Sequence, residues 1–95
     1  MPEMRFHVRW PDGAVESCYS PSLVVKEHLT PGETYPLDDF LLRTRTALLI
    51  ASDRVEQKYG MPCSLALGQL RRIEERGKGF AGLEKANVKI ESFEE

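Results

Sequence analysis

Apolar residues recur at helical spacing over one long stretch in the middle of the chain. From Pro36 to Tyr59 they fall on a single broad stripe when each residue is advanced by about 100°. Such a stripe is typical of a helix that packs against a core. We therefore predict a long central helix over about residues 37–59. The stripe consists of Leu37, Phe40, Leu41, Thr44, Ala47, Leu48, Ala51, Val55 and Tyr59.

The ends of this predicted helix carry capping signals. Asp38 is expected to cap the first turn through its carboxylate, and with Asp39 it suits the positive end of the helix dipole. At the other end, Lys58 suits the negative pole. Gly60 can adopt the left-handed conformation in which many helices end.

The opposite side of the helix carries Leu42, Leu49 and Ile50 among polar residues. Three large aliphatic side chains on a face that would otherwise meet solvent predict a second buried surface. In a chain of 95 residues, little else is available to cover it. We therefore predict a contact with a second subunit in a homodimer or higher oligomer. The alternatives are another helix of the same chain, or ordinary scattered exposed residues.

Residues 4–20 alternate as a β-hairpin does. Phe6, Val8 and Trp10 alternate with arginines and a histidine, and Pro11-Asp12-Gly13 is a strong turn signal. The sequence therefore predicts an N-terminal antiparallel hairpin. Because an isolated hairpin is marginally stable in water, it is expected to pack on the central helix or to gain a third strand.

Two registers of this hairpin are open. A two-residue turn pairs Phe6 with Tyr19 and gathers the apolar residues of both strands on one face. A type I turn with Gly13 in a bulge shifts the pairing by one residue. We favour the first register, because the shift would turn Val15 and Tyr19 away from the core.

Three shorter elements complete the predicted fold. A helical turn is expected within about 21–30, with Ser20 as its N-cap. A second helix is predicted over about 62–77, ended by Gly77 and antiparallel to the first because the link is short. It would bury a stripe made of Cys63, Ala66, Leu67, Leu70 and Ile73. Alternation over about 88–93 predicts a third strand, which joins the hairpin of this chain or of a neighbouring one.

The fold class that follows is α+β in a single small domain, residues 1–95. An N-terminal antiparallel hairpin, with a third C-terminal strand, packs on the long central helix and the second helix. The net charge of −2 gives no electrostatic reason to expect nucleic acid or a membrane surface as a partner. No stretch approaches the ~20 apolar residues that cross a bilayer, and the N-terminus has no apolar signal region. A cytoplasmic protein is expected, with Cys18 and Cys63 as reduced thiols.

Candidate chemistry is sparse. His7, Cys18, His28 and Cys63 include no close pair of the kind that structural zinc sites use. We expect no metal, no cofactor and no catalytic residue. In the favoured register, however, His7 faces Cys18 across the hairpin, beside Tyr19. These three residues form a candidate polar cluster, and the alternative function is a small-ligand-binding or catalytic pocket near them.

A second alternative is a DNA-binding regulator that uses the second helix. This helix carries Arg71, Arg72 and Arg76 and follows the central helix after a short link. Its first turns read CSLALG, however, whereas a recognition helix usually presents polar residues there. Nucleic acid is therefore not an expected partner.

Four blocks of sequence carry a family resemblance: MPEMRFHVRWPDG, ESCYSPSLVV, PGETYPLDDF and RTRTALLIASDRVEQKYGMPCSLALGQL. In this order they resemble a small bacterial family of nitrogen starvation response proteins, over about Met1 to Ile73. The tail from Glu74 onward carries no part of the resemblance. The resemblance implies a place in nitrogen limitation, in gene clusters with a nitrilase-like hydrolase, a radical-SAM protein and transferases. It assigns no catalytic or binding residue.

The function predicted from these features is that of a non-enzymatic accessory or regulatory protein. It would act through protein–protein contacts, with its own copies or with another protein of the same pathway. The candidate interface is the set Leu42, Leu49 and Ile50, which we call the outer helix face.

Overall fold

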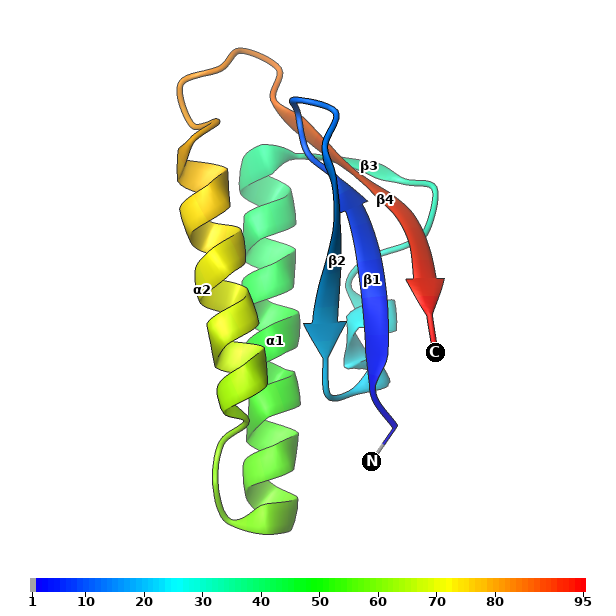
Figure 1. The fold of residues 1–95 in the computed structure, drawn as a ribbon, viewed down its shortest axis with the longest axis vertical. Coiled ribbons are helices and arrows are strands. Elements are labelled where there is room, and N and C mark those ends of the chain that lie inside the picture. The colour runs from blue at the N-terminus through cyan, green and yellow to red at the C-terminus, as the bar shows by residue number, and fades with distance from the viewer. Residues whose placement is uncertain (1) are drawn as a thin grey trace.

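A four-stranded antiparallel sheet carries two helices on one of its faces (Figure 1). The computed structural model describes residues 2–95. The strands are β1 (Met4–Arg9), β2 (Val15–Ser20), β3 (Thr34–Pro36) and β4 (Asn87–Glu94), in the spatial order β2-β1-β4-β3. The predicted α+β class is confirmed, and the C-terminal strand joins the hairpin of its own chain.

The two helices, α1 (Leu37–Tyr59) and α2 (Ser64–Lys78), form an antiparallel pair, the helical hairpin (Figure 1). The predicted bounds of α1 are confirmed, and Gly60 ends it with a φ of 83°. A short 3₁₀ helix, η1 (Leu23–Glu27), lies between β2 and β3. Its cap is Ser22, whose Oγ accepts a hydrogen bond from the Val24 amide, and not the expected Ser20.

The start of α1 corrects the prediction that Asp38 caps it. Pro36 occupies the N-cap position and has no side chain that could accept a hydrogen bond. The Leu37 amide instead donates to the carbonyl oxygen of Ala86 at 3.0 Å. The Asp38 carboxylate accepts from the neighbouring Asp39 amide at 2.9 Å. A backbone group from the segment before β4 therefore satisfies the first amide of the helix.

The prediction that Gly77 ends α2 is wrong. Gly77 lies buried inside the last turns of α2. A Cβ atom at this position would lie 2.9 Å from both methyl carbons of Leu41. A side chain at this position would therefore have to displace Leu41, where α1 and α2 approach each other closely. The buried side of α2 also contains Gln69, whose Oε1 accepts a hydrogen bond from the Tyr19 amide at 3.0 Å.

The hairpin register that we favoured from the sequence is wrong. Phe6 pairs with Cys18, one residue away from Tyr19, and Gly13 adopts a φ of 89°. The Gly13 amide donates to the Trp10 carbonyl at 2.8 Å, as a type I turn followed by a bulge requires. The chemistry of the turn therefore outweighs the apolar pattern of β2, which is an edge strand and leaves Val15 52% exposed.

A second irregularity lies where β4 pairs with β1. His7 pairs with Ser92, whereas Val8 pairs with Ile90, so Glu91 is an extra residue in β4. In a regular strand, residues three apart point to opposite faces of the sheet. Because of this β-bulge, Phe93 instead lies on the same face as Ile90. The core between sheet and helices is built around the rings of Trp10, Phe6 and Phe40.

Candidate functional site

The candidate polar cluster of His7, Cys18 and Tyr19 is not brought together. Cys18 is fully buried on the core face, whereas His7 and Tyr19 lie on the open face of the sheet, on neighbouring strands. His7 pairs with Ser17, because the true register moves it one residue away from Cys18. The predicted pocket around these three side chains therefore does not form as one site.

The buried thiol and the tyrosine are both poorly suited to acid–base or nucleophilic chemistry at neutral pH. Burial raises the pKa of the Cys18 thiol to about 12, and the charge of Glu16 acts in the same direction. Partial burial raises the pKa of Tyr19 to about 12, together with the hydrogen bond that its hydroxyl donates to Glu3 at 3.2 Å. Both groups therefore remain protonated and neutral at pH 7.

On the open face of the sheet, charged and polar side chains of neighbouring strands contact one another. His7 Nε2 donates to Glu94 Oε1 at 3.1 Å, and Arg9 pairs with Glu91. The hydrogen bond from Arg9 and its charge lower the pKa of the Glu91 carboxyl. A small hollow of about 210 Å³ lies on this side, lined by Glu3, Met4, Arg5, Tyr19, Glu94 and Glu95. Each carboxylate in its lining already has a partner: the Tyr19 hydroxyl for Glu3, the His7 ring for Glu94 and the Lys26 ammonium for Glu95.

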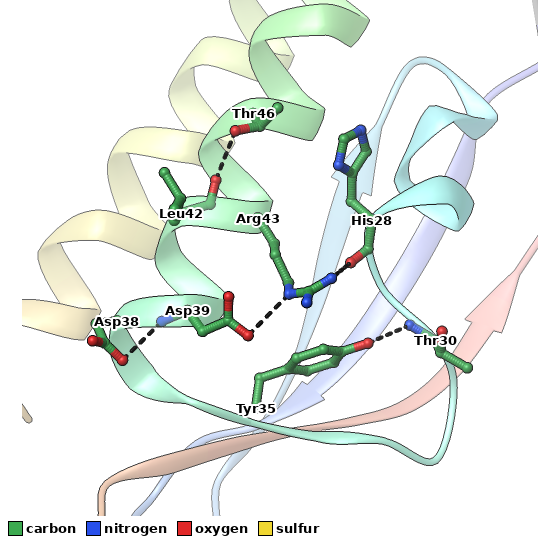
Figure 2. Close-up of polar contacts among 8 residues, drawn as sticks. All are labelled: His28, Thr30, Tyr35, Asp38, Asp39, Leu42, Arg43 and Thr46. Atoms are coloured by element: carbon green, nitrogen blue, oxygen red, sulfur yellow. Dashed lines mark hydrogen bonds and ion pairs between the residues drawn. The ribbon is translucent and has the colours of Figure 1, made fainter.

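Arg43 forms the most connected polar cluster on α1 (Figure 2). Its Nε donates to Asp39 Oδ2 and its Nη1 to the His28 carbonyl, both at 3.0 Å. The guanidinium lies 4.8 Å from the centre of the Tyr35 ring, and the Tyr35 hydroxyl accepts from the Thr30 amide. These contacts hold the segment between η1 and β3 against α1. They give Arg43 a structural role.

Two of the three arginines of α2 make contacts within the chain. Arg76 Nη2 lies 3.3 Å from Asp12 Oδ2, and its guanidinium lies 5.6 Å from the centre of the Trp10 ring. Arg72 donates to Gln69 at 3.3 Å. Only Arg71 of the three has no such contact among residues 2–95. Of the three arginines, one is therefore paired with a carboxylate and a second bonds a neutral amide.

The outer helix face is exposed to different degrees along α1. Leu42 is 64% exposed and Leu49 is 41% exposed, whereas Ile50 is half-buried. A second group, Tyr59, Met61 and Leu65, lies where α1 turns into α2, and we call it the helical tip. Its side chains are 64%, 71% and 65% exposed. The stripe predicted for α1 had placed Tyr59 in the core, but the last turn of α1 extends past the sheet (Figure 1).

A larger pocket, of about 690 Å³, lies at the other end of the helical hairpin. Its walls come from the start of α1, the end of α2 and the connection 79–86 that leads to β4. These residues were not predicted from the sequence as a site. Phe80 and Leu83 within a glycine-rich connection were the available signal, because such apolar residues seldom occur in a freely solvated linker.

Two general features bear on the class of protein. Within residues 2–95, no group of three or more His, Cys, Asp or Glu side chains is arranged to hold a metal ion. None of the helices in the same range is long and apolar enough to span a bilayer. The fold and these surfaces define a small α+β protein in which a helical hairpin covers one face of a four-stranded antiparallel sheet.

A family model described as nitrogen starvation-induced protein NitG matches residues 5–93. The chain therefore belongs to this family of nitrogen starvation-induced proteins. The resemblance to this family is confirmed, and the match continues past Ile73 to residue 93, into the tail that carried no part of the resemblance. No curated protein and no solved structure matches the chain.

Proposed function

We propose that this protein is a non-enzymatic accessory or regulatory protein of the response to nitrogen limitation, and that it acts through protein–protein contacts. Membership of a nitrogen starvation-induced family supports the biological setting. One observation carries the mode of action: Leu42 and Leu49 are 64% and 41% exposed on the outer helix face. Seven residues separate them, so they project from the same side of α1 about two turns apart.

The partner that we propose is a second copy of the chain. Leu42 and Leu49 lie on a helix of 23 residues, and such a surface can pack against its own symmetry mate. The polar residues around them are already paired within the chain. Arg45 bonds Glu74 of α2 at 2.9 Å, and Thr46 Oγ1 donates to the Leu42 carbonyl at 3.0 Å. A dimer could therefore cover the two leucines without leaving the polar side chains of Arg45 and Thr46 buried and unpaired.

We place this activity in the cytoplasm. Cys18 and Cys63 are both free thiols, which supports a reducing compartment. The pocket near His7, Cys18 and Tyr19 is not proposed as a ligand site, because those side chains point to opposite faces of the sheet. DNA binding is not proposed, because Arg72 and Arg76 are engaged within the chain.

Light scattering coupled to size-exclusion chromatography tests the proposal. The wild type is expected to be a dimer at micromolar concentration. Leu42→Glu combined with Leu49→Glu is expected to be monomeric, because each of the two copies would bury two carboxylates at the interface. Met61→Glu, on the helical tip where the side chain is 71% exposed, is the control and should remain dimeric.

The same variants separate the alternatives. A wild type that is monomeric at every concentration would exclude self-association. A dimer that Met61→Glu dissociates, and that the double variant does not, would move the interface to the helical tip. If the wild type is monomeric, capture from nitrogen-limited and nitrogen-replete cells then tests contact with another protein. In that case the double variant should lose a partner that the wild type binds only under limitation.

A further inference from the structure

The pocket at the start of α1 is larger than a packing defect and is built from three separate segments. Its volume of about 690 Å³ lies in the range of sites for small organic ligands. Six apolar residues line it: Leu37, Leu41, Phe80, Ala81, Leu83 and Ala86. Pro36, Asp38, Gly77, Lys78, Lys85 and Asn87 complete the lining.

The walls of the pocket are held by contacts that do not depend on its contents. The Phe80 ring stacks on Trp10 with their centroids 5.9 Å apart, and Trp10 also meets the edge of Phe40. At the other end of the connection, the Ala86 carbonyl accepts from the Leu37 amide. The pocket is therefore formed before a ligand arrives, which lowers the entropy cost of binding.

One wall exposes apolar surface that nothing in residues 2–95 covers. Leu83 is 56% exposed, although it lies in a connection whose two ends are fixed. Leu41 is half-buried and presses its methyl groups against the backbone of Gly77. An apolar body inserted here would remove both leucines from water and would gain about 25 cal/mol for each Å² of apolar surface covered.

The charged residues of the lining favour an anion. Lys78 and Lys85 make no ion pair with a carboxylate in residues 2–95, whereas the remaining charge in the lining is Asp38 alone. Lys85 has a φ of 56°, which is uncommon for any residue except glycine, asparagine or aspartate. Two unpaired ammonium groups against one carboxylate leave the pocket with a net positive charge.

We propose that this pocket binds a small amphiphilic carboxylate. The apolar chain or ring of the ligand contacts Leu41 and Leu83, and its carboxylate pairs with Lys78 and Lys85 at the rim. This inference is independent of the proposed self-association, because the pocket residues do not include Leu42, Leu49 or Ile50. Either one can fail while the other holds.

Titration of ¹⁵N-labelled protein with octanoate, below its micelle concentration, tests the proposal. Octanoate is expected to bind in the millimolar range and to shift the amide resonances of residues 37–41 and 77–87 in a saturable way. Octan-1-ol and octylammonium have the same chain and serve as the uncharged and cationic probes. Two partly exposed ion pairs should make octanoate bind about threefold to tenfold more tightly than octan-1-ol.

Substitution of the two lysines tests whether they pair with the carboxylate of the ligand. Lys78→Gln together with Lys85→Asn should lower octanoate affinity to that of octan-1-ol and leave octan-1-ol unaffected. Asparagine is chosen because it tolerates a positive φ. Lys58→Gln, which removes one lysine at the far end of α1, is the matched control and should change neither affinity.

Ala81→Trp supplies a second, independent test, because a bulky ring on this exposed lining residue should fill the pocket and abolish binding of octanoate and of octan-1-ol alike. Equal affinity for the three probes would overturn the assignment of an anion. Octanoate shifts that do not saturate, or that avoid residues 77–87, would overturn the site itself. That result would leave the pocket as a surface for another protein.

Discussion

At the scale of single residues, the thiol of Cys18 couples stability to alkaline pH. The side chain is fully buried, and burial raises its pKa from an ordinary value of 9.0 to about 12. When the pH lies between these two pKa values, the unfolded chain loses the thiol proton while the folded protein keeps it. The unfolded state is then favoured as the pH rises, so the free energy of unfolding falls by up to about 1.4 kcal/mol per pH unit.

Urea unfolding of the wild type and Cys18→Ala at pH 8, 9.5 and 10.5 measures this effect. The alanine variant is expected to be less stable at pH 8, because a buried atom is removed. Its stability should nevertheless fall less steeply with pH than that of the wild type. Tyr19, whose pKa is also raised, contributes to both proteins and cancels in the comparison. Parallel pH profiles would contradict the assignment to Cys18.

Gly77 and Gly68 form a matched pair of glycines in α2. A Cβ atom at Gly68 would meet nothing within 4 Å, whereas one at Gly77 would lie 2.9 Å from both Leu41 methyl carbons. Gly68→Ala should therefore stabilise the protein by about 0.5–1 kcal/mol through helix propensity. Gly77→Ala gains the same propensity but overpacks the contact with α1, at a cost of about 1–3 kcal/mol.

Chemical denaturation of both variants provides the measurement. Gly77→Ala is expected to be less stable than Gly68→Ala by about 1–3 kcal/mol, and no more stable than the wild type. Equal stabilisation by the two substitutions would mean that Leu41 rotates freely into the neighbouring pocket, and that the close approach of α1 and α2 is not constrained by this glycine.

At the scale of elements, the predictable features are those that one element determines by itself. The bounds of α1 followed from its periodicity and from Gly60, which directly follows its last residue, so both signals are local to this one element. The hairpin register depended on a competition between turn chemistry and apolar pattern, and the edge position of β2 decided it. β3 has only three residues, too few for a periodic signal, and its pairing with β4 joins distant parts of the chain.

The candidate sites follow the same rule. The outer helix face could be read from α1, because its residues repeat along one helix. The pocket could not, because it needs Leu37 and Leu41 to meet Phe80 and Leu83 across about forty residues of sequence. The contact that places those segments together, from the Leu37 amide to the Ala86 carbonyl, leaves no local pattern.

At the scale of the whole molecule, the long shape separates two ends with different properties. The protein measures 42 × 22 × 18 Å, and the helical tip extends beyond the sheet (Figure 1). No side chain from residue 53 to residue 65 is fully buried, whereas the first half of α1 contributes Phe40, Thr44 and Leu48 to the core. The tip is therefore held mainly by the pairing of the two helices with each other.

Hydrogen exchange should follow this division. Amides in residues 54–59 are expected to exchange at least about tenfold faster than those in residues 41–51, because the tip can open without exposing the core. Uniform exchange along α1 would show that the helical hairpin opens as one unit. The measurement at several protein concentrations also bears on self-association. A dimer formed through the outer helix face should slow exchange around Leu42 and Leu49 as concentration rises, and it should leave the helical tip unprotected.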